Sequence, residues 1–240
     1  MSAAHAADTA AAAHVFVDAL DDTIELEGPE RHHLARVRRL RAGEHVTGSD
    51  GDGSWRLYEV TAASPDQLAL GAITASTCEP PPATRIVLAF APTKGGGTER
   101  VVQHATELGV DELRPLVTRR TVVRWDHERE TAAAARLERV ARAAAAQCFR
   151  SRLPVVGPAV TLRELSTRGG LVVATRVGER RPELPIGPEW VLAVGPEGGF
   201  APEELVGAES APRLALGDHV LRAETAAIVG CSVLARFRGT

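Results

Sequence analysis

The chain has 240 residues, of which 44% are hydrophobic and 25% charged, a balance typical of a folded globular protein. Its formal net charge of −3 excludes a uniformly basic nucleic-acid binder, so any contact with nucleic acid must use local basic patches. No apolar run approaches the roughly 20 residues that a helix needs to cross a bilayer. Three cysteines without C-x-x-C spacing argue against a disulfide framework and a zinc site. We therefore expect a cytoplasmic protein with no membrane contact and no metal site.

The beginning of the chain reads as a tail followed by a small β-rich domain. Residues 1–13 are rich in alanine, lack the basic segment of a secretory signal, and are expected to form a disordered tail. A domain over residues 14–77 is then expected, with a short helix at 31–41 whose core face carries Leu34, Val37 and Leu40. Its strands are expected at 14–17, 44–49, 55–62 and 67–73.

The rest of the chain reads as an α/β domain. Residues 78–83 include three consecutive prolines and are expected to form an extended linker. From residue 84 to residue 240, apolar strand patterns alternate with helical patterns, which indicates a parallel sheet flanked by helices. The strands are expected at 85–91, 112–117, 171–175, 190–194 and 213–216, and the longer helices at 128–149 and 223–237.

Two glycine-bearing turns near the C-terminus are the most informative feature of the sequence. Residues 195–200 (Gly-Pro-Glu-Gly-Gly-Phe) follow one expected strand, and residues 216–222 (Leu-Gly-Asp-His-Val-Leu-Arg) follow the next. Glycine permits positive φ angles and a close approach of the backbone to a ligand. Because open α/β sheets bind ligands at the carboxyl ends of adjacent strands, the two turns predict one small-molecule site.

The same turns resemble the motifs of a known enzyme family. Residues 195–199, followed by Leu216-Gly217 and residues 220–226 (Val-Leu-Arg-Ala-Glu-Thr-Ala), are similar to the C-terminal motifs of SPOUT methyltransferases, and most similar to the RsmE family. Residues 94–96 (Lys-Gly-Gly) and 106–110 (Thr-Glu-Leu-Gly-Val) resemble that family's first-helix motif. Residues 33–39 with Gly43 resemble its PUA-like RNA-binding module. The matches follow the family's order over nearly the whole chain.

The resemblance implies both a fold and a reaction. RsmE enzymes methylate N3 of one uridine in the decoding region of 16S ribosomal RNA with S-adenosylmethionine, so the implied partner is that RNA, within the small ribosomal subunit. The implied fold is a trefoil-knotted parallel sheet behind a PUA-like domain, assembled as a homodimer. By position in the motifs, the cofactor site would comprise Thr175, Gly195, Glu197, Gly198, Gly199, Leu216, Gly217, Val220, Leu221 and Arg222.

The implied reaction requires removal of the proton on N3 of the uridine. A uridine N3 is a poor nucleophile until its proton leaves, so a base is needed, or a cation that stabilises the developing anion. Arg222 is the candidate for the cationic role, and Glu224 or His219 for the base. Two structural alternatives stay open: Arg222 could bridge to Glu197 or Glu224, and Glu224 could simply brace the fold.

Methylation at N3 also requires an unpaired or flipped-out base, so the RNA must be held by its backbone. The candidate contacts form basic groups along the chain, and Lys94 is the only lysine in the protein. The alternative is that these side chains are merely the solvated face of their elements. The candidates are Arg31, Arg36, Arg38, Arg39, Lys94, Arg119, Arg120, Arg150 and Arg152, with Arg124 beside the second group.

Three other functions compete with this hypothesis. The chain could be an RNA-binding protein that keeps the fold without catalysis, or a SPOUT methyltransferase with another RNA target. A phosphate loop at residues 94–97 is disfavoured, because the lysine precedes the glycines there and the nucleotide-binding pattern places it after them.

Overall fold

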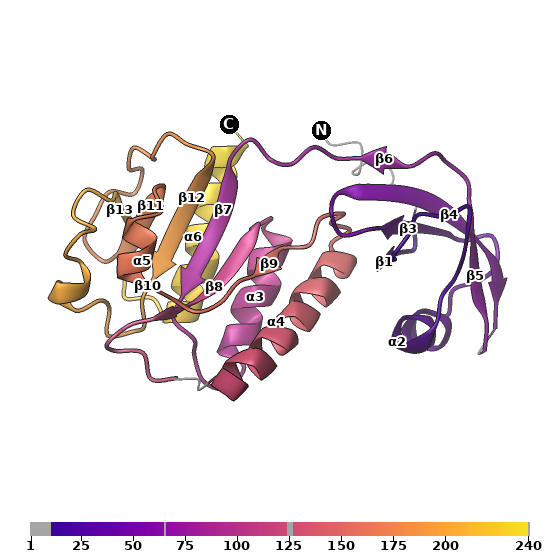
Figure 1. Ribbon diagram of the computed structural model, residues 1–240, viewed down its shortest axis with the longest axis horizontal. Coiled ribbons are helices and arrows are strands. Elements are labelled where there is room, and N and C mark those ends of the chain that lie inside the picture. The colour runs from indigo at the N-terminus through magenta and orange to yellow at the C-terminus, as the bar shows by residue number, and fades with distance from the viewer. Residues whose placement is uncertain (1–10, 65, 124–126, 240) are drawn as a thin grey trace. The chain divides into compact units, whose positions relative to one another are not determined.

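The computed structural model describes residues 11–64, 66–123 and 127–239 (Figure 1). These residues form two compact units, the first reaching to Pro81 and including Arg142–Leu153, the second comprising Pro82–Ala141 and the chain from Pro154 onward. Residues 1–10 of the expected tail lie outside the described residues. Ala13, expected in that tail, is 2% exposed and opens the first strand, so the expected tail is too long at that end.

The first unit is built on a six-stranded sheet of order β1-β3-β4-β5-β2, with β6 paired to β4. The β1–β3 pair is parallel and the other pairs are antiparallel. The four predicted strands are confirmed to within one residue, whereas β2 and β6 were not predicted, and β6 takes Cys78 out of the expected linker. The strands are β1 (Ala13–Phe16), β2 (Thr23–Glu25), β3 (His45–Ser49), β4 (Ser54–Ala63), β5 (Leu68–Ala72) and β6 (Thr77–Cys78).

The predicted helix of this unit has an unexpected form. It runs as α2 (Gly28–His32) into the π-helix η1 (His33–Arg38) and ends at Arg39, whose φ is +58°. Leu34 and Leu40 are buried as predicted, but Val37 is 64% exposed, so its place on the core face is wrong. The physical reason is the wider π turn, because a period longer than 3.6 residues rotates the middle residue away from the sheet.

A segment from the middle of the chain completes the first unit. Arg142, in the last turns of α4 (His127–Gln147), stacks its guanidinium 4.9 Å from the Phe16 ring and bonds to Glu30 at 3.1 Å. Phe149 lies with its ring 6.0 Å from His14. The sequence pattern alone assigned this segment to the α/β domain.

His14 is a buried, neutral histidine in this unit. Its two ring nitrogens lie 2.8 Å from the Thr47 hydroxyl and 2.9 Å from the Ser49 hydroxyl. Both contacts are hydrogen bonds to neutral groups, so nothing compensates a charge on the ring. Burial therefore lowers the pKa of His14 from 6.5 to about 4.

This histidine makes the folded state sensitive to acid. Between pH 6.5 and pH 4, His14 is protonated in the unfolded chain but not in the folded chain. The free energy of unfolding therefore falls as the pH falls. A difference of this size corresponds to about 3 kcal/mol of unfolding free energy. We expect His14→Gln to flatten the stability profile over this window in urea unfolding, while the control His45→Gln keeps the wild-type slope. Parallel profiles for all three proteins would contradict the assignment.

The second unit is an α/β domain, as predicted, and its sheet has seven strands. Its order is β10-β8-β7-β12-β11-β13, with β9 paired to β8, and every pair is parallel. The five predicted strands are confirmed, and two short ones, β9 and β10, were missed. The strands are β7 (Arg85–Phe90), β8 (Glu112–Val117), β9 (Val155–Val156), β10 (Val160–Thr161), β11 (Leu171–Thr175), β12 (Glu189–Val194) and β13 (Arg213–Ala215).

Helices cover this sheet and close its core. They are α3 (Gly97–Glu107), the first part of α4, α5 (Leu162–Ser166), the 3-10 turn η2 (Pro202–Glu204) and α6 (Ala223–Arg238). Strand β7 is buried on both faces: Ile86 and Leu88 pack in the cluster with α3 and α6, while Val87 packs in the cluster with α5. A continuous apolar run is therefore what this central strand requires.

Helix α6 lies directly against strand β12. A Cβ on Gly230 would come within 2.6 Å of the Leu192 side chain, and Cys231 is fully buried. These small residues therefore allow α6 to pack closely on β12 within one subunit.

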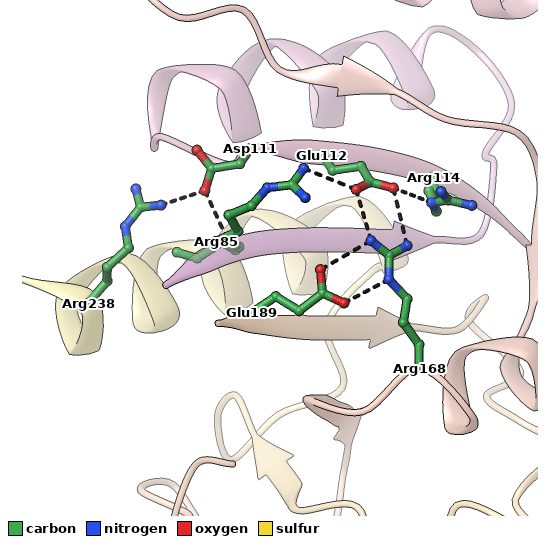
Figure 2. A network of polar contacts seen from close by, with 8 residues as sticks. Arg85, Asp111, Glu112, Arg114, Arg168, Glu189 and Arg238 are labelled. Carbon is green, nitrogen blue, oxygen red and sulfur yellow. Dashed lines mark hydrogen bonds and ion pairs between the residues drawn. The ribbon is translucent and has the colours of Figure 1, made fainter. Parts of the chain in front are cut away.

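Figure 2 shows an ionic network at the amino ends of the central strands. The Glu112 carboxylate, only 5% exposed, pairs with Arg85, Arg114 and Arg168, and Arg168 also pairs with Glu189. Burial alone would raise the pKa of Glu112, but the hydrogen bonds from Arg168 and Arg114 outweigh it and lower that pKa. Glu112 is thus a charged hub that joins β7, β8 and the turn after α5, and Arg168 extends the network to β12 through Glu189.

Loss of this hub leaves three guanidinium groups without their shared partner. We expect Glu112→Gln to lower the unfolding free energy by about 3 kcal/mol, since removal of one member of a buried ion pair strands the others. The matched variant Glu189→Gln, which meets Arg168 alone, should cost about 1 kcal/mol. Urea unfolding at neutral pH measures both. Equal losses in the two variants would show that Glu112 is not the hub.

Candidate functional site

The carboxyl ends of three neighbouring strands form one edge of the second sheet. Strand β11 lies between β12 and β13 and is parallel to both, with Val173 opposite Ala193 and Thr175 opposite Ala215. The segments that leave these strands therefore start side by side. They enclose a pocket of about 240 Å³.

This pocket gathers the residues that the two turns predicted. It is lined by Thr175, Gly195, Glu197, Gly198, Gly199, Leu216, Gly217, Val220 and Leu221. Arg222 is the one predicted cofactor residue that is not part of the lining. His219 also lines the pocket, although the sequence suggested it only as a base. The remaining lining residues were not predicted from the sequence: Ala174, Arg176, Val194, Pro196, Phe200, Ala223 and Ala226.

The glycines of the 195–200 turn are required by its backbone and by its neighbours. Gly199 has a φ of +69°, and its N–H donates to the Pro196 carbonyl at 2.7 Å. A Cβ on Gly195 would lie 3.2 Å from the Phe200 ring. The turn thus folds tightly over an aromatic side chain, which puts several peptide groups at the pocket wall.

The chemistry of the lining suits a ligand with a flat apolar part and a polar part. Leu216, Leu221 and Phe200 supply apolar surface, whereas the glycine-rich backbone supplies hydrogen-bonding groups. Two charged residues, Glu197 and Arg176, also line the pocket. The pocket can therefore bind a small molecule that combines a heteroaromatic ring with charged groups.

Arg222 stands at the start of α6 with its side chain exposed. It is the N-cap residue, with extended backbone (φ −65°, ψ 152°). Among the described residues, no ion pair to its guanidinium is found, so the bridge to Glu197 or Glu224 that the sequence left open is not formed. Arg222 is one residue beyond Leu221 of the pocket wall, and it is a cation with freedom to reach a ligand there.

Glu224 has a structural partner instead. Its carboxylate bonds to Arg100 of α3 at 2.9 Å. A Cβ on Gly97, the first residue of α3, would lie 2.3 Å from the same carboxylate oxygen. Glu224 therefore sits at the positive end of a helix dipole and ties α3 to α6. This geometry favours the bracing role over the role of a base, and His219, which lines the pocket, is the better placed group.

The predicted RNA contacts divide between the two units. In the first unit, Arg36, Arg38 and Arg39 are exposed, while Arg31 donates to the Asp66 carbonyl and Arg152 to the Glu79 carbonyl. Arg150 lies in the same unit. In the second unit, Lys94 is exposed, Arg119 pairs with Glu203 at 3.4 Å, and Arg120 donates to the carbonyls of the 195–200 turn. Arg124 lies outside the described residues. Contact with RNA stays a prediction for all of them.

A second, larger cavity opens at the carboxyl end of β8. It has a volume of about 670 Å³ and shares no residue with the pocket described above. Its apolar wall includes Val117 and Val206, and its rim carries Arg119, Glu203 and Arg163. We call it the β8 cavity. It holds none of the predicted cofactor residues.

Across the described parts of the chain, no helix combines the length and the apolar character that a membrane span requires.

Comparison with known proteins supports the interpretation of the two units as a PUA-like domain and an RNA methyltransferase domain. A family model described as "RNA methyltransferase domain" matches residues 79–235, and one described as "RNA methyltransferase PUA domain" matches residues 26–72. A protein of Mycobacterium bovis named ribosomal RNA small subunit methyltransferase E is 33% identical, covering 89% of this chain and 87% of the relative. The protein of that name from Bacillus subtilis is 26% identical, covering 88% and 89%.

Solved structures show the same fold. A Legionella pneumophila protein with bound S-adenosylmethionine is 26% identical, with a TM-score of 0.78 over 93% of this chain and 97% of that one. The ribosomal RNA small subunit methyltransferase E of Neisseria gonorrhoeae superposes with a TM-score of 0.80 at 23% identity, covering 94% and 97%. The family models and the Mycobacterium bovis relative show that the chain belongs to the RsmE family of RNA methyltransferases, with its PUA-like domain at the N-terminal end.

Proposed function

We propose that this protein transfers the methyl group of S-adenosylmethionine to N3 of one uridine in the decoding region of 16S ribosomal RNA. The substrate is the RNA within the small ribosomal subunit, and the reaction takes place in the cytoplasm. Support comes from the family and from relatives named for methylation of small-subunit ribosomal RNA. The observation that carries the proposal is the pocket, where three strand ends bring together the predicted cofactor residues except Arg222.

The pocket fits S-adenosylmethionine by the character of its walls. Leu216 and Leu221 would contact the adenine ring, and the peptide groups of the 195–200 turn would pair with its polar edge. Glu197, which also lines the pocket, carries the negative charge that suits the amino group or the sulfonium. When bound, S-adenosylmethionine supplies an electrophilic methyl group.

The remaining task is to make N3 of the uridine nucleophilic. Arg222 is exposed, unpaired among the described side chains, and adjacent to the pocket wall, so its guanidinium can stabilise the negative charge that develops on the uracil ring. His219 lines the pocket and is the candidate acceptor of the N3 proton. Glu224 keeps α6 in place through Arg100.

The RNA and the assembly complete the proposal. The PUA-like domain, proposed to span residues 14–77, would hold the RNA backbone through Arg36, Arg38 and Arg39, whose side chains are exposed. The resemblance further supports a trefoil knot in the domain over residues 84–240 and a homodimer as the active form.

A matched pair of glycine variants tests the cofactor pocket. Gly199 and Gly169 both have positive φ, of +69° and +81°, and a Cβ at either position would meet no other atom within 4 Å. Gly199→Ala and Gly169→Ala should therefore lose similar stability, about 1 kcal/mol each. Only Gly199→Ala should weaken the binding of S-adenosylmethionine in calorimetry, by about tenfold, because only Gly199 lies in the pocket. Equal affinities in both variants would place the cofactor elsewhere.

A second variant tests the chemistry. Arg222→Ala should lower methyl transfer to unmodified small subunits by at least about a hundredfold, since a cation is lost where charge develops. Its affinity for S-adenosylmethionine should stay within a few-fold of wild type. The readout is the methylated nucleoside, mapped in the RNA, and the control is Arg181→Ala, an exposed arginine outside the pocket lining. Full activity of Arg222→Ala would remove that residue from the mechanism, and cofactor binding without any transfer by the wild type would favour a non-catalytic RNA-binding protein.

A further inference from the structure

The turn that follows strand β8 is held by two buried hydroxyl groups. Thr118 and Thr121 are 4% and 5% exposed, and their hydroxyls lie 2.9 Å apart. The Thr118 N–H donates to the Thr121 hydroxyl at 2.9 Å, and the Thr121 N–H donates back to the Thr118 carbonyl at 3.2 Å. The turn is therefore closed on itself, so the two arginines at its tip start from a fixed backbone.

The second of these arginines reaches the cofactor turn. The Arg120 guanidinium donates to the Gly198 carbonyl, and at 3.4 Å to the Phe200 carbonyl. A Cβ on Gly198 would lie 3.3 Å from Cδ of Arg120, so the side chain also packs along that glycine. The acceptors are backbone carbonyls, and a charged donor makes such bonds stronger than a neutral one would.

The backbone of Arg119 holds the segment that follows the 195–200 turn. The Arg119 N–H donates to one Glu204 carboxylate oxygen at 2.8 Å, and the other oxygen accepts from the Ala201 N–H at 2.8 Å. Residues 198–204 are thus fastened at both ends to residues 119–120. Gly198 and Gly199 have little conformational preference of their own, so these external contacts add to the turn's own Gly199–Pro196 hydrogen bond in limiting their backbone.

From these contacts we propose that Arg120 is a positioning residue for the cofactor pocket, acting through the Gly198 and Phe200 carbonyls, and not a contact to RNA phosphate. The inference rests on the proposed function, since it names a residue that shapes the same pocket. Arg120 does not line the pocket, and it acts by keeping the 195–200 turn in the form that accepts the ligand. Without it, the turn must be ordered when the ligand binds, which reduces affinity.

Calorimetry with S-adenosylmethionine on the full-length protein, without RNA, tests the proposal. We expect Arg120→Ala to raise Kd by about tenfold. Arg120→Lys should raise it by about threefold, because one Arg120 nitrogen, Nη1, donates to both carbonyls, and the ammonium that would replace it is on a shorter side chain and is more strongly hydrated. Arg163→Ala, an exposed arginine at the rim of the β8 cavity, is the control and should bind the cofactor as wild type does. Thermal unfolding of each variant should change by no more than a few degrees, which separates positioning from general loss of stability.

The outcomes distinguish this inference from the function itself. An Arg120→Ala protein with wild-type Kd overturns the positioning role. Two results together would also overturn it: a wild-type Kd for S-adenosylmethionine in Arg120→Lys, and a weaker salt dependence of RNA binding in Arg120→Ala. Both are the behaviour of a contact to RNA phosphate. If Arg120→Ala does not fold, Arg120→Lys decides alone: a raised Kd supports the role and a wild-type Kd overturns it. If the wild-type protein binds no S-adenosylmethionine, the proposed function fails, whatever Arg120 does.

Discussion

The parallel alignment of strands β12, β11 and β13 is the constraint on which the candidate site depends. Because the three strands run side by side in one direction, the segments after Val194, Thr175 and Ala215 leave the sheet at one edge. No single segment could enclose a ligand, but together they form a pocket. The site therefore depends on the register of the sheet, which is set by apolar side chains buried on both faces of β7 and β12.

The two edges of this sheet carry different kinds of polar group. At the amino ends, the charges of Glu112, Arg168 and Glu189 satisfy one another, so that edge is a closed ionic network (Figure 2). At the carboxyl ends, Arg222 and His219 are exposed beside the pocket. Charge that is already paired stabilises the fold, whereas exposed charge beside a pocket is free to meet a ligand. This contrast explains why the amino-end edge stabilises the fold, whereas the carboxyl-end edge can bind a ligand and act on it.

Much of the architecture was predictable, because local patterns carry it. The apolar runs of β7, β11 and β12, and the glycines that follow two of the strands, are visible without any knowledge of tertiary contacts. Contacts between distant residues were not: Arg100 meets Glu224 across 124 positions and Arg120 meets Gly198 across 78. Likewise, the exposure of Val37 follows from a π turn that no composition rule marks. No local sequence signal separates an arginine that contacts phosphate from one that donates to a backbone carbonyl. The positive charge of the basic groups is therefore the only basis in the sequence for predicting that they contact RNA.

The central claim is that the 195–200 and 216–222 segments together bind the methyl donor. A crystal structure of the full chain grown with S-adenosylmethionine measures this most directly. The account predicts density for the cofactor in the 240 Å³ pocket, with the adenine between Leu216 and Leu221. Density in the 670 Å³ β8 cavity, with the smaller pocket empty, would contradict it.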